Sequence, residues 1–156
     1  MTTKTRASTF AFALSLSSVA QLLAGTGAHA QRSPITRSVT SNLQWGPCPA
    51  IFPTGCQIAV LNGDPSKRNA DVFLRVPGGY TIPAHSHTSA ERMVLVEGQL
   101  TVTYKGAAPA LLTPGVYAYG PAGLPHKAAC AGSKPCTLFI AFEGPVDASA
   151  YSGTLK

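Results

Sequence analysis

Three histidines and one glutamate stand at spacings that suit a metal site. Beyond residue 30 the only histidines are His85, His87 and His126, and Glu91 follows His87 by four residues. Imidazole nitrogens combined with one carboxylate suit first-row ions such as manganese, iron, nickel, copper or zinc. A lone histidine in a core is usually a hydrogen-bonding residue, but this grouping is a candidate site for one divalent ion of undetermined identity.

Strand periodicity gives these side chains a direction. Alternate residues of a strand share a face, so His85 and His87 are expected on one face together with Thr81 and Pro83. In the segment that begins at Glu91, the glutamate shares its face with Met93 and Leu95. A carboxylate on an apolar, inward face is tolerated only if it is paired or binds a metal.

Short apolar or alternating runs, separated by turns rich in Gly, Pro, Asn and Asp, indicate the elements that position these residues. Strands of this length at this spacing predict an all-β sandwich or barrel in one domain. The expected strands are Ile58–Leu61, Val72–Val76, Met93–Val96, Leu100–Tyr104, Ala110–Leu112, Val116–Tyr119 and Thr137–Phe142.

The N-terminal 30 residues have the features of a secretory signal. Lys4 and Arg6 precede an apolar run too short to span a membrane, and the small-residue triplet 28–30 follows it. The alternative is a helix of the core. We expect residues 1–30 to be removed, which lowers the formal net charge from +6 to +4. Export to the periplasm or the extracellular space, without a stable membrane anchor, is the resulting prediction.

Four cysteines follow the signal, at positions 48, 56, 130 and 136. In an exported protein an even number of cysteines favours disulfides, and the spacings do not suit a zinc site. Three connectivities are possible; local pairing of Cys48 with Cys56 and Cys130 with Cys136 closes the shortest loops and is preferred. We divide the rest of the chain into an extended arm (31–57), a barrel (58–143) and a tail (144–156).

Basic residues are scattered and form no stripe with interleaved aromatics, which argues against nucleic-acid binding. The expected partner is a small molecule. A homodimer is a further possibility, because the arm 31–57 could cover or swap onto a sheet edge.

Two stretches of the chain resemble the motifs of the cupin superfamily. Residues 79–98 have the pattern Gly, five residues, His-x-His, three residues, Glu, six residues, Gly, and residues 115–126 have Gly, five residues, Pro-x-Gly-x-x-His. One position departs from the family pattern, because Cys130 stands where an asparagine is frequent. The similarity extends over roughly 58–142.

The resemblance implies a jelly roll of two packed antiparallel sheets with a metal ion inside one end. It also implies that His85, His87, Glu91 and His126 are the metal ligands, leaving about two positions of an octahedral ion open. The glycines and prolines of the motifs are expected to shape turns. Residues considered for the pocket wall are Tyr80, Met93, Tyr119 and Phe139.

The cupin fold hosts many reactions, so the reaction is predicted from the site. No further acid or histidine stands at an obvious position for proton transfer, although Glu97 or Glu143 could turn inward. The favoured function is a metal-dependent oxidoreductase of the dioxygenase type, acting on a small organic molecule. The alternative is a non-catalytic cupin that binds a metal or a small ligand.

Overall fold

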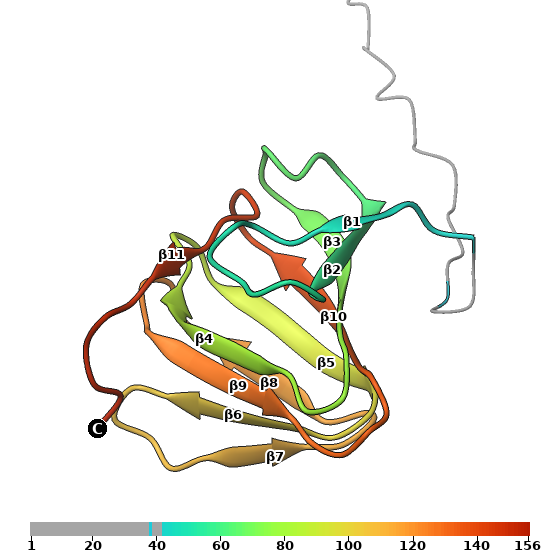
Figure 1. The fold of residues 1–156 in the computed structure, drawn as a ribbon. Helices are drawn as coiled ribbons and strands as arrows, with labels where there is room; N and C mark the ends of the chain where they lie inside the picture. Colours follow the sequence, from blue (N-terminus) through green and yellow to red (C-terminus); the bar gives the residue numbers. More distant parts are fainter. Residues whose placement is uncertain (1–37, 39–41) are drawn as a thin grey trace, which may run out of the picture. The chain divides into compact units, whose positions relative to one another are not determined.

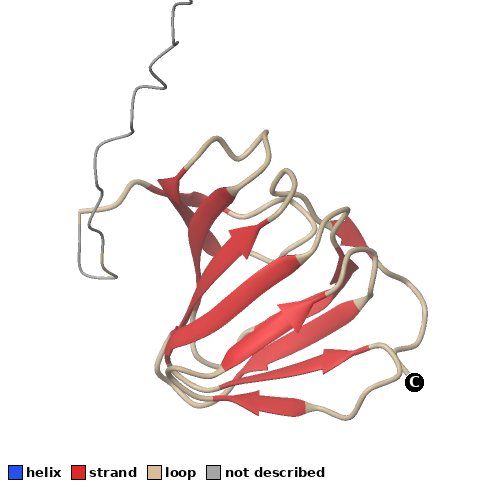
Figure 2. Ribbon diagram, turned by 180° about the vertical axis from the view of Figure 1, so that it is seen from behind, coloured by secondary structure: helices blue, strands red, loops and turns tan. Residues whose placement is uncertain are grey.

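The computed structural model describes residue 38 and residues 42–156. The predicted signal, residues 1–30, and most of the first half of the predicted arm lie outside these residues. Within the described part every regular element is a β-strand (Figure 2), as expected from the turn-rich sequence. In the described residues there is no helix with the length and apolar character needed to cross a membrane.

Eleven strands form two antiparallel sheets (Figure 1). The six-stranded sheet has the order β1-β2-β3-β10-β5-β8 and the five-stranded sheet the order β11-β4-β9-β6-β7. The strands are β1 (Trp45–Pro47), β2 (Gln57–Asn62), β3 (Ala70–Val76), β4 (Thr81–Ser86), β5 (Glu91–Glu97), β6 (Leu100–Tyr104), β7 (Ala110–Leu112), β8 (Tyr117–Gly120), β9 (His126–Cys130), β10 (Cys136–Phe142) and β11 (Ser149–Ala150).

The predicted strands are all present, within one or two residues at their ends. Two elements extend the sheets into the flanks that were expected to be arm and tail. Strand β1 pairs with β2, and β11 pairs with β4 at Ser149↔Ser86 and Ala150↔His85. These flanking strands are short, so their sequences carry little periodicity from which to predict them.

The core lies between the two sheets and contains the alternate, inward side chains of their strands. Leu95 and Val72 are fully buried on the six-stranded side, and Leu100 and Val102 face them from β6. Burying such aliphatic side chains is the main force that holds the sheets together. This is the jelly roll of two packed antiparallel sheets that the resemblance to the cupin superfamily implies.

A second apolar cluster covers the outer face of the six-stranded sheet. Leu43, just before β1, and Trp45, the first residue of β1, pack with Phe73 and Phe139, whose rings meet edge to face. Phe73, Phe139 and Ala59 are register partners across β2, β3 and β10, so they share the outer face. The arm therefore covers apolar surface that would otherwise contact water.

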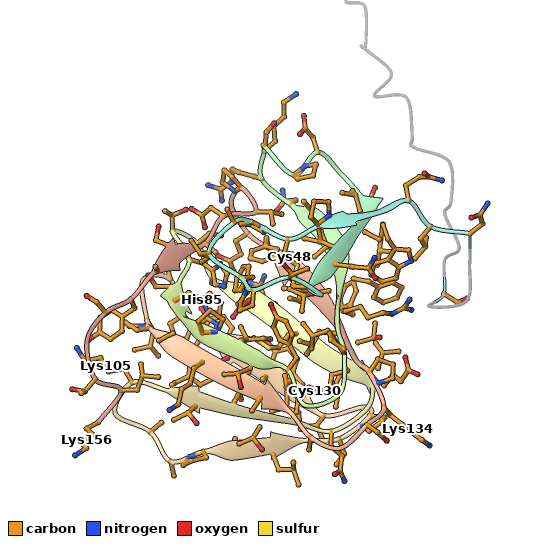
Figure 3. The ribbon with its side chains drawn as sticks, in the orientation of Figure 1. Cys48, His85, Lys105, Cys130, Lys134 and Lys156 are labelled. Atoms are coloured by element: carbon orange, nitrogen blue, oxygen red, sulfur yellow. A yellow bond between two sulfur atoms is a disulfide. The ribbon has the colours of Figure 1, made fainter. Side chains whose placement is uncertain are left out.

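Both cysteine pairs that the spacing favours are joined in the structure (Figure 3). Cys130 lies on β9 and Cys136 on β10, so this disulfide links the two sheets. The bond between Cys48 and Cys56 closes the β1–β2 loop. Each bond closes a short loop of the unfolded chain and thereby reduces its entropy.

Candidate metal centre

The first two histidines reach the space between the sheets from β4, at the end of that strand and just beyond it. His85 and His87 are 4% and 8% exposed. The pairing of β4 with β9 shifts register between Ile82 and His85, and this irregularity turns both Ile82 and His85 inward. The expectation that Thr81 shares the face of the histidines is therefore wrong, because Thr81 lies before the shift and is exposed.

Each histidine ring is fixed by a hydrogen bond from its Nδ1 to a backbone carbonyl. His85 Nδ1 lies 2.7 Å from Pro83 O, and His126 Nδ1 lies 3.2 Å from Leu124 O. His87 Nδ1 bonds to the carbonyl of Asp147. A carbonyl accepts only, so each Nδ1 carries the proton and each Nε2 keeps a free lone pair. This is the orientation that metal-binding histidines adopt.

The three histidines come together although they lie on separate segments. His126, the first residue of β9, is the register partner of His85. One ring nitrogen of each lies within 4.8 Å of the others, an arrangement that could hold a metal ion. The rings of His85 and His126 are 4.2 Å apart between centroids.

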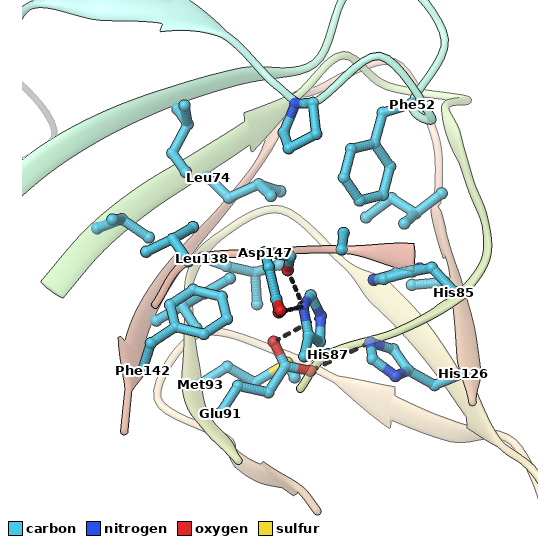
Figure 4. A pocket seen from close by; sticks show the side chains of 18 of the residues that line it. Phe52, Leu74, His85, His87, Glu91, Met93, His126, Leu138, Phe142 and Asp147 are labelled. Carbon is cyan, nitrogen blue, oxygen red and sulfur yellow. Dashed lines mark hydrogen bonds and ion pairs between the residues drawn. The ribbon is translucent and has the colours of Figure 1, made fainter. Parts of the chain in front are cut away.

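Glu91 places its carboxylate against two of these rings (Figure 4). Its Oε1 lies 3.1 Å from His126 Nε2 and its Oε2 lies 3.4 Å from His87 Nε2. The side chain is 2% exposed, and Met93 and Leu95 are buried on the same face, so the predicted orientation of β5 is confirmed. The structure thus brings together all four residues that the motifs single out.

The unpaired atoms of this cluster fit a cation. His87 Nε2 and Glu91 Oε1 are buried and have no hydrogen-bond partner among the described residues. The Nε2 atoms of His87 and His126 lie 3.4 and 3.1 Å from the two carboxylate oxygens of Glu91. A free lone pair and a carboxylate oxygen at such distances repel each other unless a proton or a metal ion lies between them. The donor set of three imidazoles and one carboxylate is also one that first-row ions accept.

Protonation states at the site agree with metal binding. Burial, followed by the charge on His126, lowers the pKa of His85 to about 4. Burial acts to raise the pKa of the Glu91 carboxyl, but contact with His126 and the charges of the other histidines bring it below its ordinary value. At neutral pH His85 is therefore uncharged and Glu91 is a carboxylate, which are the forms that coordinate a metal.

The cluster lies at the polar end of a cavity between the sheets (Figure 4). The cavity has about 50 Å³ of space for the centres of water-sized molecules, enough for a few waters or a small ligand. Its remaining walls are apolar and come from both sheets and from two flanking loops. They include Phe52, Leu74, Met93, Leu138, Phe142 and Val146.

Of the four residues proposed for the pocket wall, Met93 lines this cavity. The other three lie elsewhere. Tyr80 is buried in the core and its hydroxyl donates to Pro53 O, Tyr119 is 48% exposed on β8, and Phe139 packs on the outer face of β10. Alternation itself separates Phe139 from Phe142, because residues three apart on a strand point to opposite faces.

Three residues near the centre were not predicted from the sequence. Phe52, in the Cys48–Cys56 loop, meets the His85 ring edge-on at 5.0 Å, and Tyr104 lies 5.1 Å from the His126 ring. Asp147 lines the cavity from the segment between β10 and β11. Phe52 and Asp147 come from irregular segments, where periodicity gives no direction. Tyr104 is the register partner of His126, a relation that only strand pairing reveals.

The position of Asp147 bears on the prediction that no further acid stands at an obvious position for proton transfer, because it places a carboxylate beside the candidate metal site. Its carboxylate accepts hydrogen bonds from the Thr88 backbone N–H and hydroxyl, and Oδ1 lies 3.9 Å from His87 Nδ1. The two acids expected to be able to turn inward are engaged elsewhere. Glu97 accepts from the Thr137 hydroxyl, and Glu143 pairs with Arg92.

Comparison with known proteins agrees with this architecture. The family model described as a cupin domain matches residues 72–142. No curated protein matches the chain. Solved structures with a similar fold include the DMSP lyase DddQ from Ruegeria pomeroyi DSS-3 (22% identity, TM-score 0.60, 72% of this chain and 64% of that one) and the polyketide cyclase RemF from Streptomyces resistomycificus (17%, 0.61, 78% and 88%). An RmlC-like cupin from Shewanella frigidimarina NCIMB 400 is 18% identical, with a TM-score of 0.55 over 68% of this chain and 88% of that one.

These likenesses concern the fold. The chain spans 64% of the DddQ chain and 63% of the chain in the structures of the DMSP lyases RdDddP and RnDddQII. The family match runs from β3 to β10 and contains the three histidines and Glu91. Together with the two-sheet topology, it places the domain of residues 72–142 in the cupin superfamily.

Proposed function

We propose that this protein is an exported cupin that binds one divalent first-row transition metal through His85, His87, Glu91 and His126. We further propose that it is a metal-dependent oxidoreductase of the dioxygenase type that acts on a small organic molecule. The site is supported by the geometry of its side chains, and the reaction by the character of the cavity around them.

One observation carries the metal proposal: His87 Nε2 and Glu91 Oε1 are buried without a hydrogen-bond partner among the described residues, and that Nε2 lies 3.4 Å from the other carboxylate oxygen of Glu91. Leaving two such atoms without partners costs roughly 1–3 kcal/mol each. All three Nδ1 atoms are already bonded to carbonyls, so the rings cannot turn to relieve this without losing those bonds. A divalent ion satisfies every one of these lone pairs.

The cavity supports chemistry carried mainly by the ion. A bound transition ion supplies Lewis-acid and redox chemistry at its open positions. The chain contributes an apolar enclosure, in which Phe52, Met93 and Phe142 keep water away and hold a weakly polar molecule beside the ligands. Asp147, the other acid at the site, already accepts two hydrogen bonds from Thr88, which reduces its capacity as a base.

Export is supported by the two disulfides, because such bonds persist in oxidising compartments. Similar folds include a DMSP lyase, an oxalate oxidase and a polyketide cyclase, so the fold by itself does not select a reaction.

The second candidate is a non-catalytic cupin that holds a metal or a small ligand. The observation that favours it is the limited space, about 50 Å³ in a cavity whose lining includes Pro49, Phe52 and Val146. A storage or carrier site needs no room for a substrate beside the ion.

Metal analysis of the protein purified from its native compartment tests the site. We expect one equivalent of a first-row ion, and loss of tight binding in His126→Ala with the fold retained. Leu111→Ala, at an exposed position on β7, is the control. A folded wild type that takes up no first-row ion would contradict the metal proposal.

Oxygen consumption by the metal-loaded protein then separates the two candidates. We expect consumption with small phenols and enols, and none after His126→Ala. Stoichiometric metal binding with no turnover across such a panel would favour the non-catalytic candidate.

A further inference from the structure

We propose that Asp147 is a specificity-determining residue that makes the metal site select small uncharged molecules over anions. This inference rests on the proposed metal site. It concerns which ligands reach the ion, and it holds for an enzyme and for a carrier alike.

Asp147 is held beside the site by contacts on both its backbone and its side chain. Its carbonyl accepts the Nδ1 proton of His87, and its carboxylate accepts from the Thr88 N–H at 3.0 Å and from the Thr88 hydroxyl. Oδ1 lies 3.9 Å from the His87 ring, and the side chain is 32% exposed. Asp147 lines the cavity, and its carboxylate is therefore held beside His87, a proposed ligand (Figure 4).

The lining of the cavity contains no group that would neutralise an anion. Among the described residues that line it, no lysine, arginine, amide or hydroxyl side chain is present. The ion pairs of Arg92 and Lys67 are made elsewhere, with Glu143 and Asp64. The polar part of the lining consists of the four proposed ligands and Asp147.

The charges of the site then balance before any ligand enters. A divalent ion with Glu91 and three neutral histidines carries a charge of +1, and the carboxylate of Asp147 brings the total to zero. An anion entering from water would leave uncompensated negative charge inside an apolar enclosure, which is costly. An uncharged molecule with one or two oxygen donors leaves the net charge of the site at zero.

The apolar walls of the cavity further restrict the chemical class of the ligand. The body of the ligand would pack against Phe52, Phe142 and Val146 while its oxygen faces the ion. The proposed class is therefore a small uncharged alcohol, phenol, enol or carbonyl compound, and not a free carboxylate or dicarboxylate.

Calorimetric titration of the zinc-loaded protein with two small oxygen-donor ligands tests this proposal. Oxamide and oxalate have the same number of heavy atoms and can each offer two oxygen donors, but at neutral pH oxamide is uncharged and oxalate is a dianion. In Asp147→Asn, which keeps the size and the acceptor for the Thr88 N–H, we expect oxalate to bind about tenfold more tightly than it binds the wild type. We expect the affinity for oxamide to change little, so that the ratio of the two affinities moves about tenfold toward the anion.

Two variants serve as controls. Glu97→Gln removes the same charge at a position bonded to Thr137, away from the cavity, and should keep the wild-type preference. Asp147→Glu keeps the negative charge and should also keep the wild-type ligand preference.

The outcomes are distinguishable. Failure of the wild type to bind zinc would contradict the proposed metal site. An equal gain in affinity for oxalate and oxamide in zinc-loaded Asp147→Asn would overturn the selection by charge. Unchanged oxalate binding in a zinc-loaded Asp147→Asn would overturn it as well.

Discussion

The carboxylate of Glu91 lies directly over the backbone of Gly120. The two residues are register partners on β5 and β8, and a Cβ added at Gly120 would lie 2.7 Å from Glu91 Oε1. Gly120 is the last residue of β8. Its lack of a side chain provides the space that the proposed metal ligand occupies.

We therefore expect Gly120→Ala to lower metal affinity by about 10–100-fold, as loss of an orienting contact commonly does. The methyl group would displace the Glu91 carboxylate from the histidines. Competition with a metal-binding dye measures the affinity. Gly46→Ala is the matched control, because a Cβ there meets nothing within 4 Å. Equal affinities in the two variants would show that the contact with Gly120 does not position Glu91.

The metal-free protein should lose stability as the solution becomes acidic. Burial lowers the pKa of His85 to about 4 in the folded state, from 6.5 in the unfolded chain. Protons therefore bind the unfolded state preferentially, and the contribution of His85 is complete above pH 6.5 and lost as the pH falls to about 4. The expected decrease in unfolding free energy is on the order of 3 kcal/mol. Urea titrations at several pH values in the presence of a chelator measure it.

Replacing His85 with Gln removes the titrating ring, so the same titrations on this variant provide the control. A metal-free variant that loses as much stability as wild type between pH 6.5 and 4 would assign the effect to other groups.

The hydroxyl of Tyr104 is buried and has no hydrogen-bond partner in the described part of the chain. Burial, together with the charge of Glu91, also raises the pKa of this phenol, which keeps it protonated. Tyr104→Phe removes an unsatisfied polar group without changing the packed ring, and should raise the unfolding free energy of the metal-free protein by about 1 kcal/mol. Chemical denaturation measures the change. A loss of more than 1 kcal/mol would mean that the hydroxyl has a partner in solution.

Removal of either disulfide should lower stability, but only removal of the Cys48–Cys56 bond should also change the rate of metal removal. Replacing Cys130 and Cys136 with Ser removes the covalent link between β9 and β10 and should lower the unfolding free energy by about 2 kcal/mol. Replacing Cys48 and Cys56 should cost a similar amount. It should also speed removal of the metal by a chelator, because Pro49 and Phe52 in that loop line the cavity.

Phe52→Ala isolates the effect on metal removal, since it deletes a ring that lines the cavity and leaves both disulfides intact. We expect faster chelation than in wild type, with Leu111→Ala as the surface control. Equal chelation rates in the Phe52 variant and wild type would exclude a covering role for this ring.

The sequence alone was sufficient for the all-β class and for the grouping of the three histidines with Glu91. Both depend on local information: period-2 alternation, turn residues between strands, and the spacing of the candidate ligands. The two-sheet architecture was implied by the resemblance to the cupin superfamily, because alternation by itself left a sandwich and a barrel both open. The direction of Glu91, Met93 and Leu95 followed from the same alternation, because β5 runs without interruption on that face.

Tertiary structure alone decided the surroundings of those four residues. The register shift in β4 turned Thr81 away from the histidines, and three of the four residues proposed for the pocket wall lie outside the cavity. Phe52 and Asp147 reach the site from irregular segments, while Gly120 and Tyr104 are defined by strand partners distant in sequence. Alternation assigns a face within one strand, but it cannot state which strands pair or where a loop returns. Those contacts are fixed only when the two sheets pack and bury their common core.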